Sequence, residues 1–258
     1  MQKFTHNFST LHYKISGSGK PVLFLHGFLE DHSIWDEIYP VFVDAGFRII
    51  LVDLPCHGLS RFDGDNCSMS QMAEIIHAFL SGKNISEPFV FGHSMGGYVG
   101  LELLRLRSIK LTLLHSNFWE DSAEKKKDRN RVIDVVKKNK NFFLSEAIPN
   151  LFAPENRKKC ESIISSLIQK ATQIPTSEII AATAGIRDRK AAYDLLNKNK
   201  VNIIQGAADP IVPAELMKSE LEKLEKIPEI MLIENSGHMS MWEQPERLIN
   251  ILKSTVID

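Results

Sequence analysis

The most informative segment of this chain is Pro88-Phe89-Val90-Phe91-Gly92-His93-Ser94-Met95-Gly96-Gly97. Its apolar first half predicts a short buried strand, and the apolar positions between charges in Tyr98–Arg107 predict a helix directly after it. Ser94 therefore lies at a strand-to-helix corner with a glycine two positions to either side. This G-x-S-x-G pattern is typical of a nucleophile elbow, in which the serine hydroxyl projects above a sheet. The glycines are needed because a Cβ at either position would collide with the neighbouring strand or helix.

Apolar runs on both sides of this corner predict further strands, with helical patterns between them. The expected strands span 2–8, 10–16, 22–25, 47–52, 89–91, 111–114, 201–204 and 230–233. The expected helices span 32–45, 69–82 and 95–107, and two later ones open with Pro213 and Pro245. Near-continuous apolar runs fit parallel strands that are covered on both faces. The chain is therefore predicted to form an α/β fold with a mostly parallel, doubly wound sheet of about eight strands.

From residue 117 to about Arg187 the pattern changes to helices alone. Helical patterns cover four consecutive stretches, namely 121–140, 141–152, one that begins near Pro154 and one that begins near Pro175. The simplest organisation is a core domain formed by 1–116 and 188–258, interrupted by an all-helical cap at 117–187.

Two further residues complete a candidate catalytic group with Ser94. A serine hydroxyl needs an oriented base to act as a nucleophile. His238 follows the last expected strand, and Asp209 follows the strand before it, where Pro210 holds it extended. All three follow carboxyl ends of strands, where open α/β sheets bind ligands. Their order along the chain, serine then acid then histidine, is the order of a triad built on an elbow serine.

The same site needs two backbone donors for the developing oxyanion. The Met95 N–H, directly after the serine, is one candidate. The second is the Phe28 N–H in the loop His26-Gly27-Phe28, which follows the strand at 22–25. The Phe28 side chain would then lie beside the acyl group.

These motifs together resemble the α/β-hydrolase fold superfamily, in the branch with a helical cap. The matching segments are His26-Gly27-Phe28, Asp53-Leu54-Pro55-Cys56-His57-Gly58-Leu59-Ser60, Gly92 to Gly97, Gly206-Ala207-Ala208-Asp209 and Gly237-His238. The resemblance covers nearly all of the chain except the cap. It implies an eight-stranded sheet, a triad at Ser94, Asp209 and His238, and no metal or organic cofactor. Cys56 departs from the pattern, because relatives usually have glycine there.

Other readings of the polar residues are less favourable. Asp53 and Glu234 also end strands, but Asp53 suits a tight turn and Glu234 lies very close in sequence to His238. Three more histidines beside strand ends are expected to pack against the core: His26, His93 and His115. No short-spaced cluster of histidine, cysteine and acidic residues predicts a metal site.

Aromatic residues of the cap are core residues by default, and their place above the triad makes some of them candidates for the substrate pocket. The candidates are Trp119, Phe142, Phe143 and Phe152, with Phe28 from the core domain. Such a pocket would accept a substrate with an apolar part.

Composition sets the remaining bounds. The chain has 258 residues, 43% of them hydrophobic and 24% charged, as in ordinary globular proteins. A net charge of −1 argues against nucleic acid or an anionic membrane as partner. Three cysteines, Cys56, Cys67 and Cys160, have no paired spacing, and the first residues lack a signal-peptide pattern. These features predict a reduced, cytoplasmic protein, and nothing in them indicates an oligomeric state.

The sequence therefore predicts a serine hydrolase that cleaves a small carboxylic ester or lactone. An elbow serine excludes relatives that use aspartate there for alkyl transfer, such as haloalkane dehalogenases. Two alternatives stay open. The same triad serves carbon–carbon bond hydrolases and a menaquinone-pathway synthase that eliminates pyruvate, and some members of the superfamily are ligand sensors with slow hydrolysis.

Overall fold

The structure is a computed structural model that describes residues 1–6 and 9–257. Within these residues the strands are β1 (Gln2–His6), β2 (Ser9–Ser16), β3 (Pro21–Leu25), β4 (Arg48–Asp53), β5 (Arg61–Phe62), β6 (Phe89–His93), β7 (Lys110–Leu114), β8 (Val201–Gly206) and β9 (Ile230–Ile233). Asn7 and Phe8, the end of the strand expected at 2–8, lie outside the described residues.

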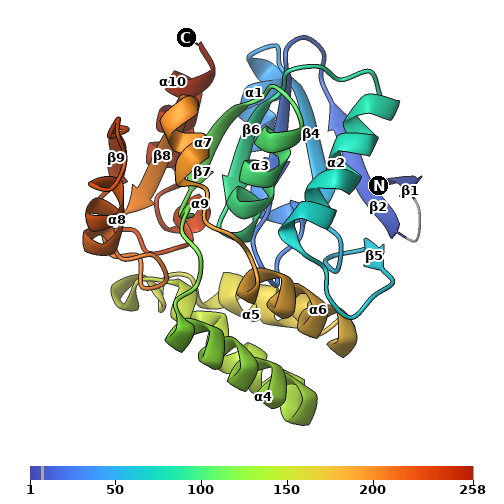
Figure 1. Cartoon of the computed structure of the whole chain (residues 1–258), viewed down its shortest axis with the longest axis vertical. Coiled ribbons are helices and arrows are strands. Elements are labelled where there is room, and N and C mark those ends of the chain that lie inside the picture. The colour runs from blue at the N-terminus through green and yellow to red at the C-terminus, as the bar shows by residue number, and fades with distance from the viewer. Residues whose placement is uncertain (7–8, 258) are drawn as a thin grey trace.

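The nine described strands form one twisted sheet in the order β1-β2-β4-β3-β6-β7-β8-β9, with β5 paired to β2 (Figure 1). The strands from β4 through β9 in this order pair in parallel, whereas β1, β2 and β5 are antiparallel to their neighbours. The prediction of a mostly parallel α/β sheet is confirmed.

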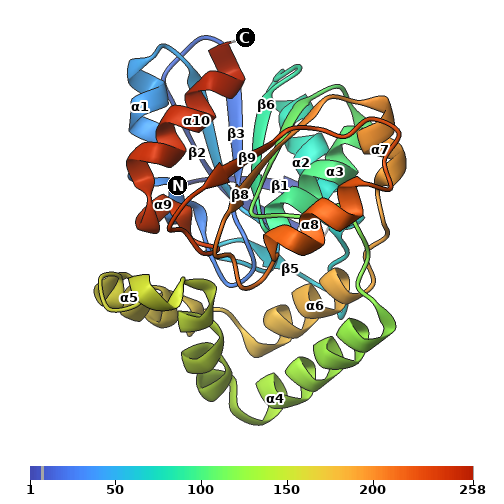
Figure 2. The same cartoon turned by 90° about the vertical axis from the view of Figure 1, so that its left-hand side faces the viewer.

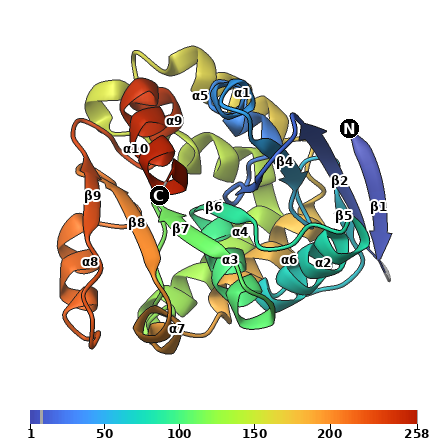
Figure 3. The same ribbon diagram turned by 90° about the horizontal axis from the view of Figure 1, so that it is seen from above.

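Helices cover both faces of the sheet, which explains why its central strands are mostly apolar (Figure 3). Along β3, Val22 and Phe24 point into the core on one face, and Leu23 and Leu25 point into the core on the other. A strand with both faces covered therefore carries mainly apolar side chains.

One face carries α1 (Tyr39–Asp44) and α10 (Pro245–Ile257), with the short α9 (Ser240–Glu243) at the start of α10. The other face carries α2 (Met69–Gly82), α3 (Met95–Leu106), α7 (Tyr193–Lys198) and α8 (Ala214–Leu221). None of the described helices combines the length and the apolar character needed to cross a membrane.

The single helix expected over 32–45 is two shorter elements. A 3₁₀ turn spans His32–Trp35, capped by the Asp31 side chain, and α1 follows after a break. Pro40 lies in the first turn of α1. Proline has no N–H to donate and its ring clashes with the carbonyl four residues earlier, so a continuous helix cannot pass through it.

Three of the helices between β7 and β8 gather beyond the carboxyl ends of the parallel strands (Figure 2). They are α4 (Ala123–Ala147), α5 (Glu161–Ala171) and α6 (Thr176–Arg187), with 3₁₀ turns at Pro149–Leu151 and Pro154–Asn156. The two stretches expected at 121–140 and 141–152 correspond to the two halves of α4, which meet at Asn139, whose backbone is not helical (φ −155°, ψ 83°), and the second half ends at Ala147.

Candidate active site

Ser94 occupies the corner between β6 and α3 in a strained backbone conformation (φ +49°, ψ −116°). A positive φ is uncommon for a residue with a Cβ and persists only where the surroundings enforce it. Here the Ser94 N–H donates to the Leu114 carbonyl at 2.9 Å, and the Ser94 carbonyl accepts from the Gly97 N–H at 2.9 Å. Ser94 is partly exposed, whereas His93 and Met95 on either side of it are buried.

The two glycines of the elbow are required by contact with neighbouring backbone. A Cβ on Gly92 would lie 2.6 Å from the Gly96 carbonyl oxygen. A Cβ on Gly96 would lie 2.4 Å from the carbonyl oxygen of Leu25, at the end of β3. Neither position has room for a side chain, as the elbow pattern predicts.

His238 and Asp209 form a buried hydrogen-bonded pair, with 2.8 Å between His238 Nδ1 and Asp209 Oδ2. The other oxygen, Asp209 Oδ1, accepts from the N–H groups of Ile211 at 2.8 Å and Val212 at 3.0 Å. Burial alone would raise the pKa of Asp209, but His238 and His115 lower it well below its usual range. Asp209 is therefore a carboxylate that holds the His238 ring in one orientation.

The serine and the histidine are not hydrogen-bonded to each other. Among the described residues, Ser94 Oγ forms no hydrogen bond, and His238 Nε2 forms none either. Catalytic hydrogen bonds are often long or poorly aligned without substrate and tighten only in the complex.

His115 also contacts the acid. Its Nδ1 lies 3.2 Å from Asp209 Oδ2, and its Nε2 lies 2.6 Å from Ser240 Oγ. Burial lowers the pKa of His115 to about 4, so its ring is neutral near pH 7. Sequence reasoning missed this contact because His115 is far from Asp209 along the chain.

One set of ligand-type atoms in the described residues is compact enough for a metal ion. It consists of His115, Asp209 and His238, whose nitrogen and oxygen atoms lie within 4.8 Å of one another. Asp209 Oδ2 accepts from His238 Nδ1 and lies 3.2 Å from His115 Nδ1, which is also the acceptor of the Gly206 N–H at 3.1 Å. This arrangement fits an acid shared by two imidazole rings.

The loop that carries His238 is anchored by Glu243, which sequence reasoning missed. The Glu243 carboxylate is buried and accepts four hydrogen bonds of 2.7–3.0 Å, from Gly237 N, Met239 N, Ala153 N and Asn156 Nδ2. The His238 N–H donates to the Leu151 carbonyl at 2.9 Å. The histidine loop is thus tied directly to the segment between α4 and α5.

The two predicted oxyanion donors lie on separate elements. Met95 begins α3, where first-turn N–H groups have no partner within the helix. Phe28 lies in the loop after β3, and its N–H makes no hydrogen bond within the described residues. His26 shapes this loop by donating from Nδ1 to the Gly27 carbonyl and accepting the Leu54 N–H at Nε2, both at 2.8 Å.

The predicted pocket aromatics have different surroundings. Trp119 lines a cavity of about 590 Å³ together with Tyr98, Ile211 and Leu216. Phe152 is completely buried and stacks on Trp242, so it packs as a core residue. Phe142 is 57% exposed, and Phe143 packs against the core. Contact between these four residues or Phe28 and a substrate stays a prediction.

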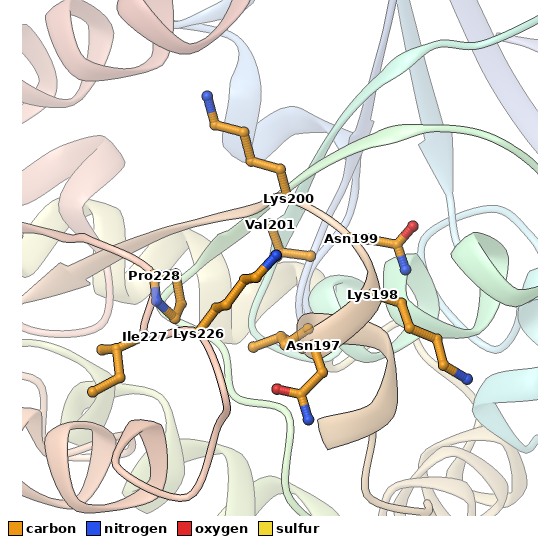
Figure 4. Close-up of a pocket in the computed structure, with 9 residues that line it drawn as sticks. Asn197, Lys198, Asn199, Lys200, Val201, Lys226, Ile227 and Pro228 are labelled. Atoms are coloured by element: carbon orange, nitrogen blue, oxygen red, sulfur yellow. The ribbon is translucent and has the colours of Figure 1, made fainter.

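A second cavity, of about 280 Å³, lies at the amino end of β8, the opposite end from Asp209 (Figure 4). Three lysines line it, Lys198, Lys200 and Lys226. Figure 4 shows their side chains pointing in different directions, so they do not converge on one bound group.

A family profile matches most of the chain. The profile described as "Alpha/beta hydrolase family" matches residues 22–251. The chain belongs to the alpha/beta hydrolase family. A relative within it is the AB hydrolase superfamily protein YisY of Bacillus subtilis, which is 24% identical over 255 residues, 94% of each chain.

Solved structures of this family are similar over almost the whole chain. A thermophilic esterase from Thermogutta terrifontis, with malate bound, is 27% identical and superposes with a TM-score of 0.87, covering 95% of this chain and 92% of that one. An esterase from Exiguobacterium antarcticum shares the fold, with 21% identity and a TM-score of 0.86 over 97% of this chain and 96% of that one.

Proposed function

We propose that this alpha/beta hydrolase is a serine hydrolase that cleaves a small carboxylic ester or lactone through an acyl-enzyme on Ser94. The observation that carries the proposal is the 2.8 Å hydrogen bond between Asp209 and His238. Asp209 follows β8 and His238 follows β9, so both come after carboxyl ends of parallel strands, as Ser94 does after β6. The similarity to an esterase at 27% identity supports ester chemistry.

The proposed reaction has two halves. His238 Nε2 removes the Ser94 hydroxyl proton as Oγ attacks the substrate carbonyl, and Asp209 stabilises the imidazolium that forms. The N–H groups of Met95 and Phe28 stabilise the oxyanion. The leaving alcohol then takes the proton from His238 and departs, and a water activated by the same ring hydrolyses the acyl-enzyme.

In this proposal the helices α4, α5 and α6 act as a cap over the site. They lie beyond the strand ends that carry the three residues (Figure 2). The cavity beside Trp119 has a mixed wall, with apolar side chains such as Ile211, two residues from Asp209, and charged ones such as Arg129. The apolar part of this wall favours a substrate with an apolar acyl or alcohol part.

The direct test is covalent labelling with a fluorophosphonate together with turnover of short-chain p-nitrophenyl esters. Ser94→Ala is expected to lose the label and to lower kcat by about 10⁴-fold or more, because no other group supplies the nucleophile. Ser70→Ala, an exposed serine on α2, is the matched control and is expected to behave like wild type. Equal rates in Ser94→Ala and wild type would exclude the assignment. Rapid turnover of a diketone, with little or no turnover of esters, would instead assign the three residues to carbon–carbon bond cleavage.

A further inference from the structure

Two buried, charged side chains lie beneath the proposed site and connect its separate parts. Glu30 Oε2 accepts the Gly27 N–H at 2.6 Å and lies 3.0 Å from His93 Nδ1. His93 Nε2 lies 2.9 Å from the carbonyl oxygen of His238. The side chain of His93 is completely buried and that of Glu30 is 4% exposed. The proposed reaction uses neither of them.

The contacts define the protonation of His93. A carbonyl oxygen can only accept a hydrogen bond, so His93 Nε2 carries a proton. Glu30 Oε2 already accepts the Gly27 N–H, and His93 holds the pKa of Glu30 below its ordinary value, so Glu30 is a carboxylate that only accepts, His93 Nδ1 carries the second proton and the ring is an imidazolium. Burial would lower the pKa of His93, but the charge and hydrogen bond of Glu30 raise it above its ordinary value.

Other titratable groups face His93 from the neighbouring loops. The ring of His238 lies 5.0 Å away and the ring of His115 lies 5.9 Å away, between centroids. Asp209 contributes a second negative charge that favours the protonated ring. Glu30 is the acid in direct contact, and burial, which would raise the pKa of Glu30, is outweighed by His93, which lowers it. The pair is thus a buried ion pair.

The pair joins three segments that are distant in sequence. Gly27 immediately precedes Phe28, the proposed oxyanion donor, and a Cβ on Gly27 would lie 2.8 Å from Glu30 Oε2 and 2.9 Å from His93 Nδ1. His93 immediately precedes Ser94. The carbonyl that His93 binds belongs to His238, the proposed base.

We propose that Glu30 and His93, as carboxylate and imidazolium, are positioning residues that set the distance between the oxyanion loop and the loop of the base. The expected effect on kinetics rests on the proposed function. The ionic state of His93 is independent of that function. Reaction rates depend steeply on such distances, and a displacement of about 1 Å can cost about 10²-fold.

The first experiment tests the ionic state in the wild-type protein, whatever reaction it catalyses. Nitrogen-15 NMR of the histidine rings at neutral pH is expected to show both His93 nitrogens protonated. His93→Gln identifies the signal by its loss. A neutral His93 ring at neutral pH would overturn the proposal.

The second experiment uses enzyme kinetics to test the two contacts of His93, one with Glu30 and one with the His238 carbonyl, separately. Glu30→Gln removes the charge, His93→Gln keeps a donor near the Nε2 position, and His93→Asn keeps one near the Nδ1 position. Each is expected to lower kcat and kcat/KM together by on the order of 10²-fold with KM nearly unchanged, because positioning matters in the transition state. His77→Gln, a histidine replacement on α2 away from the site, is the control.

The outcomes are distinguishable. Variants that keep wild-type kcat while folded, checked by thermal unfolding, would overturn the positioning role. A variant that fails to fold leaves the decision to the NMR of the wild type and to the remaining variants. If wild type neither takes the fluorophosphonate label nor hydrolyses esters, the proposed function fails, while a doubly protonated His93 still shows the ion pair.

Discussion

The Asp53 carboxylate holds two loops together at the carboxyl end of β4. Its Oδ1 accepts from His32 Nδ1 at 2.6 Å and from the His32 N–H at 3.0 Å, and its Oδ2 accepts the Leu59 N–H at 2.8 Å. Gly58 has φ +55°, and a Cβ there would lie 2.4 Å from this carboxylate. Burial would raise the pKa of Asp53, but His32 and the N–H donors lower it to about 2. The turn therefore depends on an ionised side chain.

Acid should weaken this turn. A carboxyl with a lowered folded-state pKa contributes stability above its unfolded pKa and loses it as the pH falls through the folded value. We expect Asp53 to contribute about 2 kcal/mol to the free energy of unfolding near neutral pH, a contribution that declines from about pH 5 to about pH 2. Urea unfolding of wild type and Asp53→Asn across this range measures it. A difference between the two proteins that does not change with pH would contradict the expectation.

The helix α4 behaves as two helices joined at Asn139. The Asn139 side-chain oxygen accepts the Phe142 N–H at 3.1 Å, which is the hydrogen bond of an N-cap. The next residue, Lys140, donates to the Thr172 carbonyl at 2.8 Å and the Ile174 carbonyl at 2.9 Å, just after α5 ends. The kink therefore places a cation against carbonyls that lie just beyond the C-terminal end of another helix.

Removing the internal cap should destabilise the protein modestly. Asn139→Ala is expected to lower the free energy of unfolding by about 1 kcal/mol, because the Phe142 N–H loses its acceptor. Asn139→Asp retains an acceptor at the same place and is expected to stay close to wild type. Urea unfolding of the three proteins gives the comparison, and equal losses in both variants would argue against capping.

The two ends of the inserted helices meet in a buried ion pair. Asp121 precedes α4 and Arg189 follows α6, and their side chains are 2.7 Å apart and at most 5% exposed. Arg129 adds a second contact to Asp121 at 3.1 Å. The Arg189 guanidinium lies 4.3 Å from the ring centre of Tyr98 on α3. The ion pair thus joins the segment before α4 to the segment after α6, and Arg189 also packs on α3.

Breaking this pair should cost far more than breaking one on the surface. Asp121→Asn leaves Arg189 buried without a full counter-charge and is expected to lower the free energy of unfolding by about 3 kcal/mol or more. Asp194→Asn removes the partner of Arg105 in a pair whose side chains are 48% and 34% exposed, and is expected to cost under about 1 kcal/mol. Chemical unfolding compares the two variants. Similar losses would show that Arg189 does not depend on Asp121.

Sequence patterns predicted the parts of this protein that depend on neighbours along the chain. The apolar runs predicted the long strands, and the glycines around Ser94 predicted the turn, because side-chain periodicity and steric limits act over a few residues. Short elements such as β5, α7 and α9 were missed because two to six residues are too few to show a period. The break at Pro40 was missed although proline signals it.

The contacts of the candidate site depend on residues that only the folded chain brings together. Glu30 meets His93, 63 residues away, and Glu243 joins the nearby His238 loop to Ala153, 90 residues away. Each of these carboxylates is stable in the interior only because hydrogen-bond donors surround it there. The local sequence does not predict which donors these are, because several of them come from distant parts of the chain. The order of Ser94, Asp209 and His238 could be predicted from the chain, whereas the buried polar groups that hold them follow from packing.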